Sequence, residues 1–253
     1  MFDLKGKTAF ITGASSGIGK ECAKIYAKNG VNLILTARRF EKLEELKKEL
    51  EIFNVTVDIY ELDVKERDSV NKLIESLNKT PFILINNAGL ASGLNKIQDG
   101  DFEDWDAMID TNLKGLLNVS RFMIPKMIKE NKGHIINIGS IAGHQVYQNG
   151  NVYNATKFAV NALNQAMNLD LNGTNIRVTS IDPGAVETEF SIVRFHGDVN
   201  KANNVYKGFT PLKPEDIANI IYFVTTLDEH INIQNILVTP TAQRNVTTIH
   251  KEL

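Results

Sequence analysis

The 253-residue sequence lacks the features that mark several large classes of protein. Its only cysteine, Cys22, cannot form a disulfide within the chain, and its place in a helical pattern indicates a small core residue. A formal net charge of -2 gives no basic surface for nucleic acid, and no run of about 20 apolar residues is present to span a bilayer. Histidine, cysteine and acidic residues show no clustered spacing of metal ligands. We therefore expect a small-molecule ligand, and no nucleic-acid, membrane or metal partner.

The N-terminal residues enter a strand pattern almost at once. They leave no room for the basic segment, apolar region and cleavage site of a signal peptide, so we expect a cytoplasmic protein. A chain of 253 residues with 43% hydrophobic content can bury one large core. Because no tandem repeat, low-complexity tract or Pro/Gly linker divides the chain, we expect residues 1–253 to form a single domain.

Short β-branched runs alternate with longer segments of helical period. The predicted strands are 8–12, 32–37, 55–61, 82–86, 134–138 and 176–181, with a weaker seventh at about 236–239. Their almost wholly apolar character is typical of parallel strands that helices cover on both faces. The pattern predicts an α/β fold: a Rossmann-type, doubly wound parallel sheet of about seven strands.

Two of the segments between strands have a distinct character. Residues 40–53 form an amphipathic pattern, with Leu43, Leu46 and Leu50 on one stripe. Residues 188–208 are the least regular part of the chain, polar and glycine-containing. This composition suits a movable flap over a pocket.

A glycine-rich turn follows the first predicted strand and opens the next helix, which is the context that a dinucleotide-binding turn requires. Glycines let the backbone approach a pyrophosphate, and free N–H groups at the helix start favour its charge. An ordinary turn without a ligand is the alternative. The residues expected to contact the cofactor are Gly13, Ser15, Ser16, Gly17, Ile18 and Gly19.

The end of the second strand distinguishes NADP from NAD. NAD-binding domains usually place an acid there to bind the adenine ribose 2'-hydroxyl. This sequence instead has Arg38 and Arg39, with no carboxylate beside them to repel a 2'-phosphate. Two guanidinium groups can hold that phosphate through charge-assisted hydrogen bonds, so we predict NADP. The alternative, a solvated helix start, is disfavoured because cations sit poorly at the positive end of a helix.

Polar residues follow other predicted strands. Asp63, after the third strand, is expected to accept a hydrogen bond from the adenine amino group, to cap the next helix, or both. Asn87, after the fourth strand, is expected to fix backbone or the nicotinamide ribose. Ser140 ends the fifth strand and would lie at the same sheet edge, where it can orient a substrate oxygen.

Tyr153 and Lys157 are spaced i, i+4 on a predicted helix at 152–171, so their side chains share one face. A phenol has an ordinary pKa of about 10, and a cation within about 4 to 6 Å lowers it by about 1 to 3 units. We therefore predict that Lys157 makes Tyr153 a usable acid or base. Taken alone, this spacing is also common as surface decoration.

In this order, the motifs TGASSGIG, NNAG, Ser140 and YNATK resemble those of the short-chain dehydrogenase/reductase family. Longer segments from Asn86 to Asp198, such as GHIINIGSIAG and PGAVETEF, resemble its NADP-dependent 3-hydroxy acid dehydrogenases. These enzymes oxidise serine, allo-threonine and related acids. The resemblance weakens after about Lys201, where VTPTAQ replaces a glycine-rich segment found in many relatives.

The resemblance implies a catalytic tetrad of Asn112, Ser140, Tyr153 and Lys157. Tyr153 would be the general acid and base, Ser140 would stabilise the reacting oxygen, Lys157 would also bind the nicotinamide ribose, and Asn112 would hold a proton-relay water. It also implies a homotetramer. Further cofactor contacts are expected at Val64, Ala88, Gly89, Pro183, Gly184, Val186 and Thr188.

A carboxylate substrate needs a cation near the reacting carbon, because a buried unpaired charge is destabilising. Arg194 is our candidate, and a solvated loop arginine is the alternative. His144, Gln145 and Gln148 are expected near the pocket without a catalytic role, and His134 is expected to be structural. The alternative functions are a broad carbonyl reductase and an NADP-sensing protein without turnover.

Overall fold

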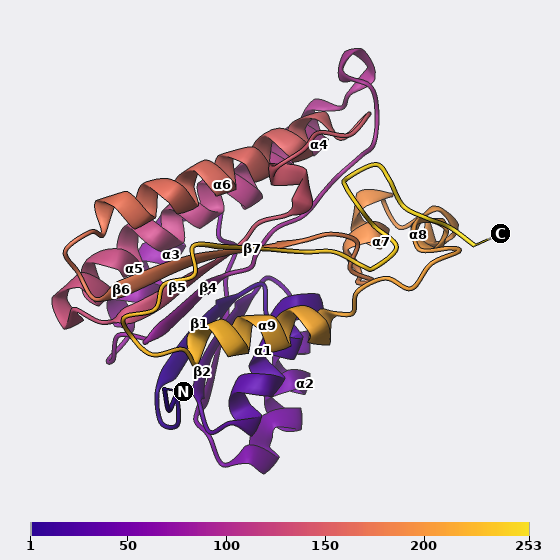
Figure 1. Ribbon diagram of the computed structural model, residues 1–253. Helices are drawn as coiled ribbons and strands as arrows, with labels where there is room; N and C mark the ends of the chain where they lie inside the picture. Colours follow the sequence, from indigo (N-terminus) through magenta and orange to yellow (C-terminus); the bar gives the residue numbers. More distant parts are fainter. Residues whose placement is uncertain (1, 253) are drawn as a thin grey trace.

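Parallel strands form one seven-stranded sheet in the computed structural model, which describes residues 2–252 (Figure 1). The strand order is β3-β2-β1-β4-β5-β6-β7, which confirms the predicted doubly wound sheet. The strands are β1 (Thr8–Thr12), β2 (Asn32–Ala37), β3 (Val57–Glu61), β4 (Ile83–Asn86), β5 (Gly133–Ile138), β6 (Ile176–Pro183) and β7 (Asn235–Val238).

Helices cover both faces of this sheet. Figure 1 shows α1, α2 and α9 on one side and α3, α4, α5 and α6 on the other. The α-helices are α1 (Gly17–Lys28), α2 (Phe40–Leu50), α3 (Arg67–Ser76), α4 (Phe102–Ile109), α5 (Leu116–Glu130), α6 (Asn151–Asp170), α7 (Phe190–Arg194), α8 (Val199–Val205) and α9 (Pro214–Thr225). The 3-10 helices η1 (Glu51–Phe53), η2 (Ile97–Asp99) and η4 (Ile141–Gly143) and the π-helical turn η3 (Asp110–Gly115) complete the set. Within residues 2–252, no helix is long and apolar enough to cross a membrane.

Each face of the sheet has its own apolar core. On the face of α1, α2 and α9, the predicted stripe of Leu43, Leu46 and Leu50 is fully buried. Burial of each leucine side chain contributes about 2 kcal/mol to folding. Cys22 lies in the same core as a free thiol, as its helical pattern predicted. Val70 and Ile74 of α3 pack in the second core with residues of α5 and α6.

The edge strands differ from the sequence expectation. The central strands β4, β5 and β6 are buried throughout, whereas β3 and β7 each have two exposed positions. Asp58 and Glu61 are exposed on β3, and Leu237 is exposed on β7. The helices cover the middle of the sheet more completely than its edges, so these two strands are not covered on both faces.

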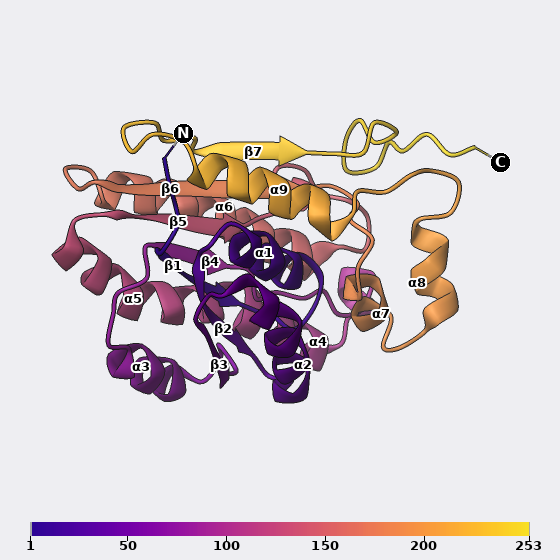
Figure 2. The same cartoon turned by 90° about the horizontal axis from the view of Figure 1, so that it is seen from below.

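The direction of strand order reverses between β1 and β4. The segments that follow these two strands therefore diverge at the carboxyl end of the sheet, which is where ligands bind in open α/β folds. Helices α7 and α8 lie at this end (Figure 2). The residues after β1, β4, β5 and β6 are brought together at this end of the sheet, and they include most of the predicted site.

Residues 188–208, hereafter the flap, are more regular than predicted. They contain α7 and α8, and Asp198 caps α8 by accepting a hydrogen bond from Lys201 N (3.0 Å). The Tyr206 hydroxyl anchors the end of α8 by donating to Val186 O (2.8 Å). Both helices are too short to produce a clear apolar period, which is why the sequence pattern did not reveal them. Movement of the flap stays a prediction.

His134 is structural, as expected. It lies buried on β5, where its Nε2 contacts Thr179 Oγ1 at 2.7 Å. The Thr179 hydroxyl donates to Ile233 O (2.6 Å), so Nε2 is the donor to Thr179. Nδ1 has no partner among residues 2–252. Burial, with a smaller contribution from Arg177, holds the pKa of His134 well below its ordinary value.

The neutral state of His134 predicts an acid-sensitive fold. The unfolded chain takes up a proton on this residue as the pH falls below about 6.5, whereas the folded chain does not. The free energy of unfolding should therefore fall by up to about 1.4 kcal/mol per pH unit below that point. His134→Gln should remove this component in urea titrations at pH 5, 6 and 7. The exposed His250→Gln variant should keep it, and equal pH slopes for wild type and His134→Gln would contradict the assignment.

Candidate active site

The turn after β1 is joined to the end of β4 by hydrogen bonds. Asn87 Nδ2 donates to Thr12 O (2.8 Å) and Gly13 O (3.1 Å), and the Thr12 hydroxyl accepts from Ala88 N (3.0 Å). This confirms that Asn87 fixes backbone. A contact with the nicotinamide ribose stays a prediction.

The close packing of this turn explains its glycines. Gly13 has a φ of +65°, and a Cβ there would lie 3.0 Å from the Ala88 Cα. A Cβ at Gly19 would lie 2.6 Å from both Asn87 Nδ2 and Gly13 O. A side chain at either position would push the turn away from β4.

The start of α1 is suited to an anion. Ser16 is the N-cap residue, but its side chain makes no capping hydrogen bond, and the first turn contains no acidic residue. The first backbone N–H groups of α1 are therefore without a side-chain acceptor at the positive end of the helix dipole. This arrangement fits the pyrophosphate of a dinucleotide, and Gly17 to Gly19 supply the backbone donors.

Arg39 lies over the same turn. Its Nη2 donates to Ser16 Oγ (2.8 Å) and Ser15 Oγ (3.2 Å), and its Nη1 donates to Glu189 Oε2 (2.8 Å). Lys42 Nζ donates to the other carboxylate oxygen of Glu189 (2.8 Å). The hydrogen bond with Lys42, together with Arg39, lowers the pKa of Glu189 to about 2.

Glu189 corrects one expectation about the phosphate site. The residues next to Arg39 in sequence include no carboxylate, but the flap brings one from 150 positions away. Spacing along the chain cannot reveal such a contact. Arg38, the other predicted phosphate ligand, is exposed.

Asp63 and Val64 follow β3. Asp63 does not cap α3, whose N-cap is Glu66, so that interpretation is wrong. Asp63 Oδ1 instead accepts from Lys65 N (3.1 Å), because the chain makes one more turn before the helix begins. Val64 is buried, and its backbone oxygen accepts from Asn118 Nδ2 (2.9 Å). An adenine contact at Asp63 stays a prediction.

Three residues of the predicted tetrad meet around Tyr153 on α6. Lys157 Nζ lies 5.9 Å from the centre of the Tyr153 ring and donates to Ile138 O at the end of β5 (2.9 Å). Ser140 lies two residues after the end of β5, and its hydroxyl accepts from Ala142 N (3.1 Å). A hydrogen bond with Ser140 lowers the pKa of Tyr153, although burial has the larger and opposite effect.

Asn112 lies in the π-helical turn η3. Its Oδ1 accepts from Leu90 N and its Nδ2 donates to Leu90 O, both at 2.8 Å. Both Asn112 Oδ1 and Lys157 Nζ border Gly89, at 3.2 and 3.8 Å from a Cβ placed there. The fourth member of the tetrad therefore lies beside Lys157. Because its side-chain amide is committed to Leu90, its role toward a relay water stays a prediction.

The pKa of Tyr153 shifts in the direction opposite to our sequence prediction. Burial, with a smaller effect of Tyr147, raises the pKa of Tyr153 to about 12. Arg194, not Lys157, is the cation that opposes this rise. The prediction was wrong because it considered only the neighbouring charge and not the loss of solvent around the phenol.

Lys157 is itself perturbed by burial, which lowers its pKa to about 8. Asp182, near the end of β6, opposes this shift by its negative charge. The Asp182 carboxylate is 1% exposed and accepts hydrogen bonds from Ser180 Oγ (2.5 Å), His144 Nε2 (2.5 Å) and Asn235 Nδ2. The sequence analysis missed Asp182, although it is a polar residue near the end of a buried strand, the same signal that identified Ser140.

Arg194 lies next to Tyr153. Its guanidinium carbon is 4.9 Å from the centre of the Tyr153 ring, 5.5 Å from that of Tyr147 and 5.4 Å from that of Phe190. Arg194 donates a hydrogen bond to the Tyr147 hydroxyl, and its Nε is buried without a partner. No carboxylate within residues 2–252 forms an ion pair with it. The structure therefore does not support a solvated loop arginine.

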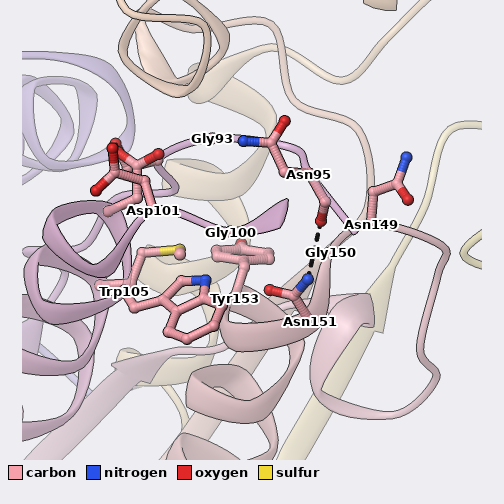
Figure 3. A pocket seen from close by; sticks show the side chains of 12 residues that line it. Gly93, Asn95, Gly100, Asp101, Trp105, Asn149, Gly150, Asn151 and Tyr153 are labelled. Carbon is pink, nitrogen blue, oxygen red and sulfur yellow. Dashed lines mark hydrogen bonds between the residues drawn. The ribbon is translucent and has the colours of Figure 1, made fainter. Parts of the chain in front are cut away.

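A small cavity borders Tyr153 on the side of α4 (Figure 3). Trp105 and Asp101 line one end, and Asn149 and Asn151 line the other. Asn151 Nδ2 donates to Asn95 O (2.9 Å) and joins the start of α6 to the loop after β4. His144, Gln145 and Gln148 are not among the residues that line this cavity.

The last residue of β6 and the segment after it carry the residues expected at the nicotinamide: Pro183, Gly184, Val186 and Thr188. A Cβ at Gly17 would lie 3.4 Å from Thr188 Cγ2, so this segment borders the turn after β1. Buried Gln243 accepts from Ala185 N (2.9 Å) and lies against Gly184. The sequence left open the role of residues 238–243 (VTPTAQ). In the structure they pack against the segment after β6 and accept hydrogen bonds from it. No sequence signal pointed to Gln243.

Comparison with known proteins shows that the chain is similar to dehydrogenases and reductases of one family. A family model described as short chain dehydrogenase matches residues 7–197. The NADP-dependent 3-hydroxy acid dehydrogenase of Schizosaccharomyces pombe is 47% identical, over 100% of this chain and 99% of its own length. Sulfoacetaldehyde reductase 2 of Chromohalobacter salexigens is 42% identical, over 92% of this chain and 94% of its own length. The closed form of serine dehydrogenase complexed with NADP+ superimposes with a TM-score of 0.91 at 41% identity, over 97% of this chain and 100% of that one.

The effect of the Asp182 charge on the pKa of Lys157 can be measured by titration. Asp182→Asn removes the negative charge and keeps the shape, so the pKa of Lys157 should fall by about one unit or more from its value near 8. NMR of the lysine Cε and Nζ nuclei over pH 6 to 10 measures this value. Ser180→Ala removes a hydrogen bond to Asp182 but keeps the charge, and should leave the titration of Lys157 close to that of the wild type. An unchanged titration in Asp182→Asn would show that the carboxylate has no such effect.

Proposed function

The chain belongs to the short chain dehydrogenase family, and on this premise we propose that it is an NADP-dependent dehydrogenase of small 3-hydroxy acids. The observation that carries the choice of substrate is Arg194, a guanidinium group without an acidic partner in residues 2–252, which lies against the ring of Tyr153. A substrate carboxylate supplies the missing partner and brings the hydroxyl-bearing carbon beside the phenol.

Each proposed residue has a defined task. The Tyr153 phenol is protonated at neutral pH, because its pKa is about 12, and it donates that proton to a carbonyl oxygen during reduction. In the oxidative direction the deprotonated phenolate of Tyr153 takes the proton from the substrate hydroxyl. Because rising pH increases the phenolate fraction, it favours oxidation. Ser140 holds the reacting oxygen, and Lys157 holds the nicotinamide ribose.

Bound NADP would supply the hydride acceptor for oxidation of the substrate carbon, and NADPH would supply the hydride for the reverse reaction. The start of α1, Ser15, Ser16, Arg38 and Arg39 are the proposed contacts of its phosphates. The presence of every residue type of the tetrad argues against a sensor protein without turnover.

A second candidate is supported by the likeness to a sulfoacetaldehyde reductase. A sulfonate carries the same charge as a carboxylate and offers Arg194 equivalent oxygen acceptors. A panel of 3-hydroxy acids, small sulfonates and neutral ketones, assayed with NADP or NADPH, separates this candidate from the first. It also separates both from a broad carbonyl reductase.

We also propose that the chain acts in the cytoplasm as a homotetramer. Exposed apolar side chains on α5 and α6 support helix-to-helix association: Leu117, Ile128, Phe158 and Leu169. Light scattering of the full chain tests the assembly.

Tyr153→Phe tests the proposed chemistry. The variant keeps the ring that packs against Phe190 but lacks the transferable proton. We expect NADPH binding, measured by fluorescence, to remain close to that of the wild type, and kcat with a 3-hydroxy acid to fall by roughly 100- to 10,000-fold. Turnover near that of the wild type would refute the role of the phenol.

Arg194→Gln tests the carboxylate contact. Loss of a charge-assisted hydrogen bond should lower kcat/KM for a 3-hydroxy acid by about 10- to 100-fold. The methyl ester of the same acid is the matched control, because it keeps the reacting hydroxyl and lacks the negative charge. Arg194 also affects the pKa of Tyr153, so the ratio between the two substrates is the decisive value. Equal losses for acid and ester would exclude a specific contact with the carboxylate.

A further inference from the structure

The carboxylate of Glu189, in the flap, binds Arg39, which the sequence predicts to bind the 2'-phosphate of the cofactor. Glu189 directly precedes α7, and each of its two carboxylate oxygens receives one hydrogen bond of 2.8 Å from a cation. One cation is Arg39, a predicted ligand of the 2'-phosphate, and the other is Lys42, in the first turn of α2.

The donors around Glu189 are those that a phosphate ester needs. A guanidinium and an ammonium group converge on one pair of oxygens, and the hydroxyls of Ser15 and Ser16 hold the second Arg39 nitrogen beside them. Carboxylate and phosphate oxygens are equivalent acceptors for such groups, but a phosphate monoester carries nearly two negative charges at neutral pH. Both anions therefore compete for Arg39 and Lys42.

The ion pairs of Glu189 are open to exchange. The side chains of Glu189, Arg39 and Lys42 are 43%, 46% and 41% exposed. Exposed ion pairs contribute little to stability, so a dianion can replace the carboxylate without disrupting the fold. Glu187, two positions earlier, is exposed and forms no ion pair with another residue of 2–252.

We infer that Glu189 is an internal competitor of the NADP 2'-phosphate, and that it sets how strongly the protein distinguishes NADP from NAD. Without the phosphate, the carboxylate neutralises Arg39 and Lys42 and holds the start of the flap against the turn after β1. The 2'-phosphate displaces it and takes over both cations. NAD carries no group that competes for them, so its binding leaves Glu189 in place. The inference rests on the proposed use of NADP.

Binding of two adenine nucleotides tests this competition without the catalytic reaction. Isothermal titration calorimetry on the full chain compares adenosine 2',5'-bisphosphate, which carries the 2'-phosphate, with ADP, which lacks it. Glu189→Gln keeps the side-chain shape and removes the charge. We expect the variant to bind adenosine 2',5'-bisphosphate roughly three- to 30-fold more tightly than the wild type, with less than a twofold change for ADP.

Glu187→Gln is the matched control, because it makes the same change in net charge two residues away. It should leave the affinity for both nucleotides within about twofold of the wild type. Weaker or unchanged binding of adenosine 2',5'-bisphosphate by Glu189→Gln would overturn the inference, since Glu189 would then be a neutral or supporting contact. An equal gain for both nucleotides would also overturn it.

The wild type alone distinguishes failure of the inference from failure of the proposed function. If it binds adenosine 2',5'-bisphosphate no better than ADP, the proposed NADP preference is wrong and the inference falls with it. If it prefers adenosine 2',5'-bisphosphate and Glu189→Gln does not increase that preference, only the competitor role of Glu189 is wrong.

Discussion

A cation enclosed at the carboxyl end of the sheet is the constraint around which the site is organised. Lys157 is 7% exposed, so its ammonium group needs compensation from the protein rather than from water. The Ile138 carbonyl supplies a hydrogen bond and Asp182 supplies a negative charge. The Asp182 carboxylate is held in turn by Ser180 of β6, His144 after η4 and Asn235 at the start of β7. The buried ammonium group therefore links the ends of β5 and β6 to α6.

A second cation approaches Tyr153 from the flap. Lys157 comes from the same helix as Tyr153, whereas Arg194 belongs to a segment that is joined to the rest of the site by a few contacts. One of them is the hydrogen bond from Gly93 N to Arg194 O (3.0 Å), and another is His196 Nε2, which lies 3.4 Å from Asp104 Oδ2. The charge environment of the phenol therefore depends on where the flap lies. Helix α6 holds one cation, and α7 of the flap brings the other.

Local patterns were sufficient to predict the sheet and much of the site. Apolar runs located every strand to within a few residues. The polar residues predicted after β1, β4 and β5 meet at the carboxyl end of the sheet, and ligand binding there stays a prediction. Asp182 was missed although its place near the end of a buried strand is a local signal. Glu189 and Gln243 escaped detection because their importance comes from partners distant in sequence. The direction of the Tyr153 shift was missed for a related reason: burial depends on the packing of the whole site, whereas the i, i+4 spacing shows only one neighbour.

The π-helical turn at Asp110–Gly115 interrupts the regular helix and places the side-chain amide of Asn112 against Leu90. A π-turn contains an extra residue relative to an α-helical turn and is often found where function requires it. Shortening this turn by one residue would let α4 run smoothly into α5, and it would also rotate Asn112 away from Leu90. A regular α-helix and the observed position of Asn112 beside Gly89 thus exclude each other. In this chain the irregular turn is present and Asn112 lies beside Gly89.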